Sequence, residues 1–276
     1  MPIFRNRAAS GLASIAVAAL TQAPAAAQRF DDKLSLRVEA YFAGVGSSAR
    51  AATNSGSLGT SIDFEEDLKL DRSQILPALE LGWRISDDWV VQGQYYSLSR
   101  RTQASLEKDI SFGETTFPVS ARIGAGVDSD VYRLTIGNLL FQRDRLEIGA
   151  GIGLHATDFG LFLEGEGQVS GGPLRFRRES RRLFAPLPTI GAFGQWEPGR
   201  RWTLFGRVDW LSLGIDDYSG RLINSEASLS YSLHRNLDVG TSYRFVDYRV
   251  RVRRPDWNGQ VRYQFAGPAI FLRAGF

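Results

Sequence analysis

Strict alternation of apolar and polar residues is the feature that most constrains what this chain can fold into. Between Lys33 and Ala43, apolar residues take every second position, and residues such as Arg37 and Glu39 lie between them. A period of two places the two sets on opposite faces of a β-strand. The pattern predicts an all-β protein, and it recurs in ten segments, at about residues 33–43, 74–85, 88–100, 131–141, 146–158, 186–196, 202–215, 222–233, 237–253 and 259–276.

The connections between these segments distinguish a membrane barrel from a soluble sheet, whose half-buried strands show the same period. Short turns alternate with connections that are mostly much longer, and this arrangement is typical of outer-membrane barrels with short periplasmic turns and long external loops. The short turns lie near residues 86–87, 143–144, 198–199 and 235–236, and the longest connections at residues 44–73, 101–130 and 159–185.

We therefore predict a closed antiparallel transmembrane β-barrel of about ten strands. Eight or twelve strands also fit, because the first long connection could hold a further hairpin near residues 61–64. Four of the six tryptophans, Trp83, Trp89, Trp196 and Trp202, bracket two of the short turns. Tryptophan at this position is typical of the aromatic girdle at a membrane interface, whereas tryptophans of a buried core would have no reason to lie beside turns.

The last strand carries the most specific signal in the chain. Four residues on one of its faces, ending on an aromatic residue, are Ile270, Leu272, Ala274 and Phe276. This strand resembles the C-terminal strand of Gram-negative outer-membrane β-barrels. The resemblance implies that these four residues are the signal read by the barrel assembly machinery, and that the protein resides in the cell outer membrane.

The start of the chain is typical of a secretory signal peptide. Arg5 and Arg7 precede an apolar stretch at residues 11–20 that is too short to cross a bilayer, and small residues follow at 25–27. We expect residues 1–27 to be removed and residues 28–276 to form a single barrel domain. The chain has no cysteine, which excludes a lipoprotein anchor residue, disulfides and thiolate chemistry.

Net charge does not point to a nucleic-acid partner. The chain has 33 basic and 30 acidic residues, and two of the basic residues lie in the predicted signal peptide. The remaining chain is nearly neutral and lacks the concentrated basic face that nucleic acid requires. We expect outer-membrane lipid and lipopolysaccharide as its surroundings. The sequence leaves the oligomeric state open.

Charged residues on the polar faces of the strands are expected inside the barrel. Both signs occur there, so we expect these side chains to pair across a narrow lumen, because an unpaired buried charge costs several kcal/mol. A narrow charged pore is the alternative, and Gly149, Gly151 and Gly153 leave one wall bare for arginines from across the lumen or for a water path. The predicted lumen network comprises Arg37, Glu39, Glu80, Arg84, Arg133, Glu147, Arg207, Asp209, Arg244 and Arg273.

Arginines outside the predicted membrane region are expected to contact lipopolysaccharide, whose phosphates suit guanidinium groups. Five lie in the predicted external loop between the fifth and sixth strands: Arg175, Arg177, Arg178, Arg181 and Arg182. The others follow a change in the last two strands, where the apolar face switches sides after Phe245 and before Pro268. We interpret the switch as an inversion above the membrane, with paired β-bulges as the alternative. Inversion places four further arginines outside: Arg249, Arg251, Arg253 and Arg262.

Enzyme chemistry has few residues to use. The two histidines are His234, at a predicted turn, and His155, which is expected to point into the lumen and form a hydrogen bond there. A histidine at the rim with a serine or aspartate nearby would resemble outer-membrane lipid A hydrolases. A barrel of about ten strands also resembles the omptin-type proteases, but the chain has no match to their paired catalytic aspartates or their aspartate–histidine pair.

An acidic stretch in the first long connection is the only candidate for a metal site. Its carboxylates lack the spacing of a calcium loop, so we expect a solvated acidic loop there. They are Glu65, Glu66, Asp67 and Asp71. We predict no catalytic site, metal or cofactor, and a structural or small-solute binding or permeation role. The alternatives are a narrow channel or transporter for small solutes and a rim-located hydrolase of lipid A or peptides.

Overall fold

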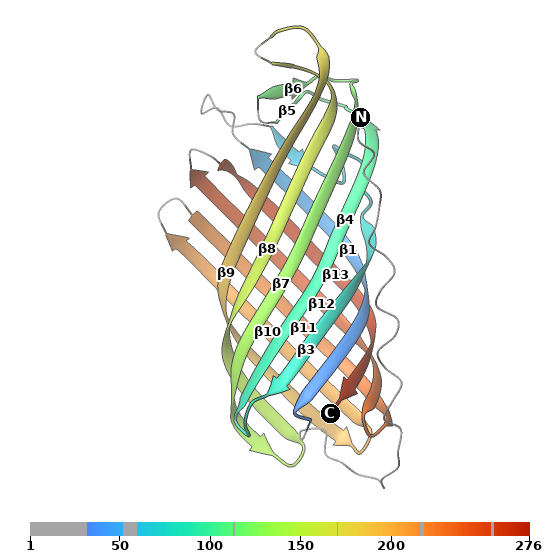
Figure 1. The fold of residues 1–276 in the computed structure, drawn as a ribbon, viewed down its shortest axis with the longest axis vertical. Coiled ribbons are helices and arrows are strands. Elements are labelled where there is room, and N and C mark those ends of the chain that lie inside the picture. The colour runs from blue at the N-terminus through green and yellow to red at the C-terminus, as the bar shows by residue number, and fades with distance from the viewer. Residues whose placement is uncertain (1–31, 52–59, 113, 170, 216–217, 255–256) are drawn as a thin grey trace, which may run out of the picture.

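The computed structural model describes residues 32–51, 60–112, 114–169, 171–215, 218–254 and 257–276, which form thirteen strands in one sheet (Figure 1). The predicted signal peptide of residues 1–27 lies outside the described residues. Within those ranges, no helix is long and apolar enough to span a membrane. All ten predicted segments are confirmed as long strands: β1 (Leu34–Ala51), β3 (Ser73–Arg84), β4 (Trp89–Ser105), β7 (Arg122–Arg143), β8 (Leu146–Val169), β9 (Arg175–Gly199), β10 (Trp202–Ile215), β11 (Tyr218–His234), β12 (Leu237–Arg254) and β13 (Trp257–Gly275).

The long strands form a closed ring of antiparallel pairs. Each long strand pairs with two others, and β1 closes the ring by pairing with both β3 and β13. At the junction, the backbone N–H of Leu34 donates to the carbonyl of Phe276 at 3.0 Å, and that of Phe276 donates to Leu34 at 2.8 Å. Figure 1 shows the strands inclined around a common axis, with the short turns together at the lower end, which we call the turn end.

The strands extend much further from the turn end than the sequence predicts. β8 continues to Val169 and β9 begins at Arg175, so the predicted connection of residues 159–185 is mostly strand. The connection predicted at residues 101–130 is likewise shortened by β4 and β7, and the one at residues 44–73 by β1. These predicted boundaries are wrong because the apolar face changes sides along the strands. In the strand parts far from the turn end, polar and charged residues take the outward positions. Such a stretch of sequence resembles a loop.

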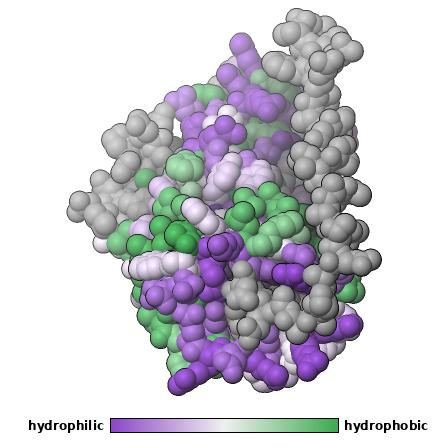
Figure 2. Space-filling model, turned by 60° about the horizontal axis from the view of Figure 1, so that its bottom comes forward, coloured by the Kyte–Doolittle hydropathy of each residue, from purple (hydrophilic) through white to green (hydrophobic). Residues whose placement is uncertain are grey.

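Near the turn end, apolar side chains face out and polar side chains face in. Val38, Ile152 and Ile270 are exposed, whereas Arg37 and Arg244 are buried. The four tryptophans beside the short turns are also exposed, as predicted. Figure 2, in which the turn end comes forward, shows hydrophilic residues at that end and hydrophobic residues on the wall above them.

Away from the turn end the polarity inverts, as one of the two sequence interpretations predicts. Val246, Tyr248 and Val250 are buried inside the ring, and Arg251 on the other face of β12 is exposed. The register between β12 and β13 runs without a shift past Gly267. The inversion is confirmed and the alternative of paired β-bulges is wrong.

A plug of apolar side chains fills the ring at the end opposite the turn end. The first long connection contributes Phe64 and Leu68, which are fully buried, and Phe64 stacks on Phe159 of β8 with ring centroids 6.2 Å apart. The predicted hairpin at residues 61–64 is only the short strand β2 (Ser61–Asp63), paired with β1. A hairpin of two further short strands, β5 (Ile110–Phe112) and β6 (Thr115–Phe117), adds buried Ile110, Phe112 and Phe117.

Candidate functional site

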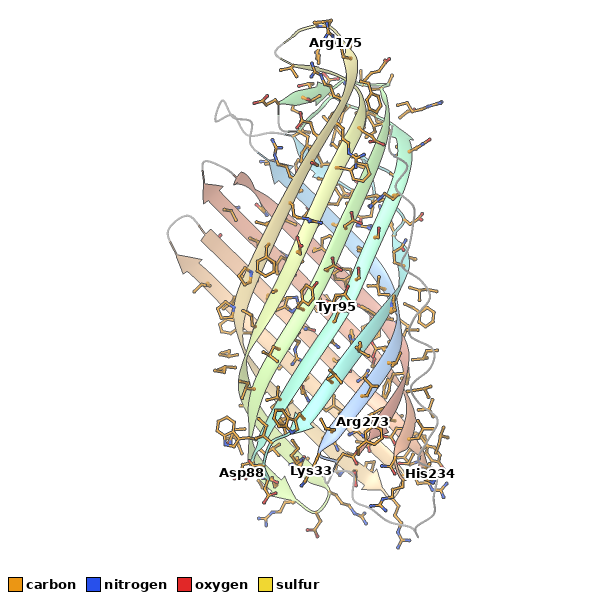
Figure 3. The ribbon with its side chains drawn as sticks, in the orientation of Figure 1. Lys33, Asp88, Tyr95, Arg175, His234 and Arg273 are labelled. Atoms are coloured by element: carbon orange, nitrogen blue, oxygen red, sulfur yellow. The ribbon has the colours of Figure 1, made fainter. Side chains whose placement is uncertain are left out.

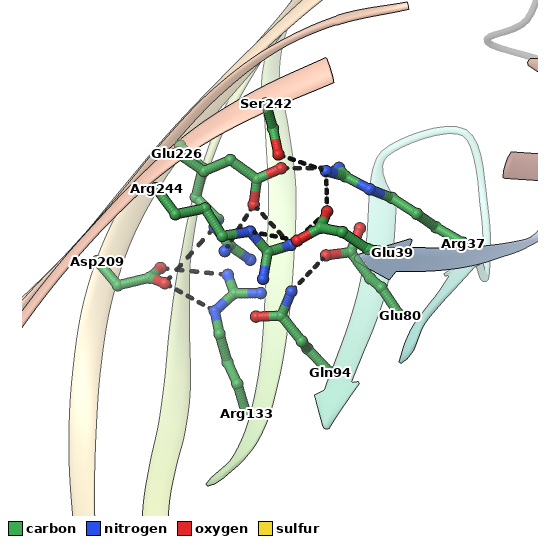
Figure 4. Close-up of polar contacts among 10 residues, drawn as sticks. Arg37, Glu39, Glu80, Gln94, Arg133, Asp209, Glu226, Ser242 and Arg244 are labelled. Carbon is green, nitrogen blue, oxygen red and sulfur yellow. Dashed lines mark hydrogen bonds and ion pairs between the residues drawn. The ribbon is translucent and has the colours of Figure 1, made fainter. Parts of the chain in front are cut away.

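A chain of buried ion pairs crosses the interior of the ring between the plug and the turn end (Figure 4). Arg37 of β1 donates from Nη1 to Oε1 of Glu226 of β11 at 2.7 Å, and it also contacts Glu39. Arg244 of β12 donates from Nη2 to Oε2 of Glu39 at 3.1 Å and lies 3.3 Å from Glu226. Two carboxylates and two guanidinium groups from three strands thus form one cluster of ion pairs.

The chain of pairs continues to the opposite wall. Arg133 of β7 donates from Nε to Oδ2 of Asp209 of β10 at 2.7 Å. Arg207 lies 3.8 Å from the same carboxylate and donates from Nη2 to Oε2 of Glu226 at 3.1 Å. We call these seven residues the ion-pair belt: Arg37, Glu39, Arg133, Arg207, Asp209, Glu226 and Arg244.

The belt is almost inaccessible to solvent. Its seven residues are 3–6% exposed, and Arg37 forms an additional hydrogen bond to the hydroxyl of Ser242 at 3.1 Å. Removing two opposite charges from water costs several kcal/mol per ion, and only close pairing with further hydrogen bonds compensates for that cost. Each belt carboxylate contacts at least two arginines, which supplies the close pairing. Several buried guanidinium nitrogens, such as Arg133 Nη1 and Arg207 Nη1, form no hydrogen bond within the described ranges.

The other predicted lumen charges lie inside the ring but outside the belt. Glu80 accepts a hydrogen bond from Gln94 at 3.1 Å. Nearer the turn end, Arg84 donates from Nη2 to both carboxylate oxygens of Glu147, at 2.9 and 2.7 Å. Arg273, which Figure 3 places close to the turn end, bridges Asp238 at 3.2 Å and Asp32 at 3.0 Å. The structure thus divides the predicted network into a central belt and separate pairs.

The sequence analysis missed three buried acids: Asp238, the partner of Arg273, and two others. Glu226 contacts three of the belt arginines, and its sequence signal is the polar series Asn224, Glu226, Ser228 and Ser230 at every second position. Glu65 was expected in a solvated loop, but it lies in the plug, where it accepts hydrogen bonds from Arg100 at 2.6 Å and from the backbone of Ser47 at 2.8 Å. The expectation for Glu65 is wrong because the loop folds into the ring.

The bare wall predicted at the glycines of β8 is covered by an aromatic ring at Gly149. Phe193 of β9 lies directly opposite Gly149. A Cβ atom added at Gly149 or at Gly137 of β7 would lie 2.5 Å from its ring. Neither of the two expected occupants, an arginine from across the lumen or a water path, covers Gly149. Glycine is favoured at position 149 because an added Cβ atom would also lie 2.7 Å from the backbone carbonyl oxygen of Asn138.

A polar cavity of about 120 Å³ lies between the belt and the turn end. Belt residue Arg37 and Glu80 line it together with hydroxyl and amide side chains that include Ser230, Thr203 and Gln195. We call this cavity the vestibule. It would hold a few water molecules or one small polar solute.

The two histidines lie far apart, with His234 exposed at the turn end (Figure 3) and His155 inside the ring. His155 is buried, with its ring 5.9 Å from that of Tyr248, and no hydrogen bond links it to a serine or an acid among the described residues. The predicted lumen hydrogen bond of His155 is therefore not found there. Nor do the described ranges contain a group of three acids or histidines placed to bind a metal. Glu66 pairs with Arg72 at 3.5 Å and Asp67 with Lys108 at 2.8 Å.

The arginines of residues 175–182 lie on β9 rather than in a loop, which corrects the prediction. Arg178 pairs with Glu164 of β8 at 2.9 Å and Arg182 with Asp158 at 3.6 Å. These partners were missed because the acids lie on the neighbouring strand. Arg181 lies 3.7 Å from Glu179, Arg177 is half-buried, and Arg175 is exposed at the end opposite the turn end (Figure 3).

The arginines after the polarity switch are on the outer surface. Arg251 and Arg262 are exposed and Arg249 is partly so, while the side chain of Arg253 lies outside the described part. Arg249 donates from Nη2 to Asp247 at 2.9 Å. All three described side chains therefore face the surroundings of the ring, as the inversion predicts.

The fold is similar to that of solved outer-membrane proteins. The outer membrane protease OmpT of Escherichia coli superposes with a TM-score of 0.60 at 10% identity, covering 91% of this chain and 99% of that chain. A FadL homologue of Pseudomonas aeruginosa reaches 0.39 at 10% identity, covering 90% and 91%. Ail of Yersinia pestis reaches 0.29 at 11% identity, covering 87% and 99%.

The likeness to OmpT shows that the chain has the fold of an outer-membrane β-barrel. At 10% identity it shows the fold alone, and the other two likenesses are too distant to add to it. No protein-family model and no curated protein matches the chain.

Proposed function

We propose that this protein is an integral barrel of the Gram-negative outer membrane with a sealed interior and a structural, non-enzymatic role. The observation that carries the proposal is the ion-pair belt, which joins strands on opposite sides of the ring. A ring of ten long strands is only slightly wider than eight-stranded barrels, whose side chains fill the interior. The belt accordingly occupies the cross-section that a solute would have to pass.

A second barrier supports closure. The plug lies beyond the belt, and its largest side chains, such as Phe64, Phe112 and Phe117, are fully buried. Ions or polar solutes entering from the vestibule would have to break the belt and then cross an apolar region. Either step costs several kcal/mol because charges or polar groups lose their partners.

The membrane location is supported by the outer surface of the barrel. Exposed apolar side chains such as Ile75 and Ile152 surround the half nearest the turn end, and exposed tryptophans lie beside two of the turns. This is the arrangement of a lipid-facing band with an aromatic girdle. Placing the turn end in the periplasm puts the plug and the start of β9 on the outer side of the membrane, where lipopolysaccharide surrounds the barrel. Phe276 would serve the barrel assembly machinery.

Absence of catalysis is part of the proposal. His155 is enclosed between the belt and the plug, where no large substrate has access. The sequence also has no match to the paired aspartates or the aspartate–histidine pair of omptin-type proteases. The vestibule favours one further role, the binding of a small polar solute from the periplasmic side. Transport would require both barriers to move.

Liposome swelling tests the proposal. Purified protein reconstituted into vesicles should leave the vesicles impermeable to small sugars and amino acids. Swelling at rates that scale with protein content would support the channel alternative and contradict the sealed interior.

A further inference from the structure

Three arginines lie side by side on the outer face of β11, β12 and β13. Arg249 of β12 is the direct register partner of Arg221 on β11 and of Arg262 on β13. Side chains of directly opposite residues on one sheet face lie about 5 Å apart at Cβ. Three guanidinium groups therefore share one short stretch of surface, which we call the arginine row. Sequence analysis placed two of its members outside the barrel and missed Arg221.

The arginine row has little local compensation for its charge. Asp247 accepts two hydrogen bonds from Arg249, at 2.9 and 3.2 Å, and lies 4.0 Å from Arg262. Within the described ranges, no ion pair involves Arg221. Three cations thus face one carboxylate. Like charges that lie directly opposite on neighbouring strands destabilise a sheet, so a bound anion would stabilise this arrangement.

The outward arginines on the other side of the barrel have local compensation for their charge. Each has a carboxylate of its own on the neighbouring strand: Arg101 with Asp128 at 2.9 Å, Arg178 with Glu164 at 2.9 Å, and Arg182 with Asp158 at 3.6 Å. Arg178 additionally lies 4.4 Å above the ring of Phe162. These arginines are already neutralised and provide a matched set for comparison.

The arginine row lies just beyond the apolar band of the outer surface. On β12 the exposed apolar positions end at Tyr243 and the half-buried Phe245, and Asp247 and Arg249 follow on the same face. On β13 the exposed apolar positions end at Ile270 and Pro268. Arg262 is the third outward-facing residue beyond Pro268 on the same face. If the band lies in the hydrocarbon, the row meets the headgroup layer of the outer leaflet.

We propose that Arg221, Arg249 and Arg262 form a binding site for a phosphate group of the outer-leaflet glycolipid, lipopolysaccharide. Guanidinium forks bind phosphate oxygens bidentately, and three converging forks match the several oxygens of one phosphate. The inference rests on the proposed membrane location. It assigns the contact to the β11–β13 side and not to the charge-paired arginines of β9.

Native mass spectrometry of the purified full chain in detergent tests the site. The probes are diphosphoryl lipid A and lipid A from which both phosphates have been removed. The test variant carries Arg221→Gln, Arg249→Gln and Arg262→Gln, and the control variant carries Arg101→Gln, Arg178→Gln and Arg182→Gln. Because each charge-assisted hydrogen bond contributes about a tenfold factor, the test variant should bind diphosphoryl lipid A at least about tenfold more weakly than wild type. The control should stay within about twofold.

Two further measurements sharpen the test, and the first of them does not depend on the folding of the test variant. Asp247→Asn should tighten binding of diphosphoryl lipid A, because it removes the carboxylate that competes for the same guanidinium groups. Dephosphorylated lipid A should bind wild type and test variant equally weakly. Equal losses in test and control variants, unchanged binding in the test variant, or weaker binding after Asp247→Asn would each overturn the site.

The source of the phosphate is tested by competition. Inorganic phosphate at millimolar concentration should not displace diphosphoryl lipid A, whose acyl chains add to its affinity. Full displacement would indicate a free-anion site and contradict the lipid assignment. Cell fractionation tests the membrane location separately, and swelling assays test closure, so failure of the proposed function is distinguishable from failure of this site.

Discussion

Glu226 of β11 accepts a hydrogen bond at 2.7 Å from Arg37 of β1, a residue 189 positions away in the chain and on a strand that does not pair with β11. The contact crosses the interior instead of following the sheet. The same carboxylate contacts Arg207 and Arg244. Glu226 therefore joins the two halves of the belt, and it contacts more belt arginines than Glu39 or Asp209 does.

The cost of breaking a pair should depend on its burial. Asp209→Asn leaves Arg133 and Arg207 short of a counter-charge at a site where the side chains are 1–4% exposed. We expect a loss on the order of 3 to 5 kcal/mol in the free energy of unfolding. Glu147→Gln, at a pair whose side chains are 10–17% exposed, should cost less because water reaches it. Urea unfolding in lipid vesicles measures both, and equal losses would contradict a dry belt.

The plug should be as important for stability as the belt. Phe64→Ala removes a fully buried ring that stacks on Phe159, and we expect a loss of about 3 to 5 kcal/mol. Phe184→Ala serves as the control, because that side chain is exposed on β9. Thermal unfolding of the reconstituted protein would show a large shift for Phe64→Ala only. A small shift for Phe64→Ala would mean that the first connection does not seal the ring.

Alternation predicted the strands well because every long strand has one face outside the ring. It located all ten, and the inward set correctly included Arg37, Arg133 and Arg244. The plug could not be predicted in this way, since a loop that folds into the lumen has no periodicity and its acidic residues suggest solvent. The start of β9 was missed for a related reason: its arginines occupy both faces, and their partners are on β8.

The terminal aromatic residue should act in assembly more than in the folded state. Phe276 is 67% exposed, although its backbone pairs with Leu34. Phe276→Asp should therefore refold in detergent with nearly wild-type stability but fail to reach the outer membrane of cells. Heat-modifiable mobility of outer-membrane fractions measures this, with Phe184→Asp as the control. Wild-type levels of Phe276→Asp in that fraction would refute the signal.

The proposed periplasmic position of the turn end predicts which connections an antibody can reach from outside the cell. A short epitope inserted between Gly171 and Gly172, in the connection from β8 to β9, should be labelled by antibody on intact cells. An epitope inserted between Arg200 and Arg201, in the turn from β9 to β10, should be labelled only after the outer membrane is permeabilised. The reverse pattern would invert the orientation and place the arginine row in the inner leaflet.

Single-channel recording is the most direct test of the sealed interior. Wild-type protein in planar lipid bilayers should give no steady current. Glu226→Ala should give current steps, because three belt arginines lose a shared partner and the barrier loosens, while Glu164→Gln, on the outer face, should remain silent. Steady, salt-dependent steps from the wild type, with Glu226→Ala changing only their charge selectivity, would contradict closure and identify the barrel as a channel.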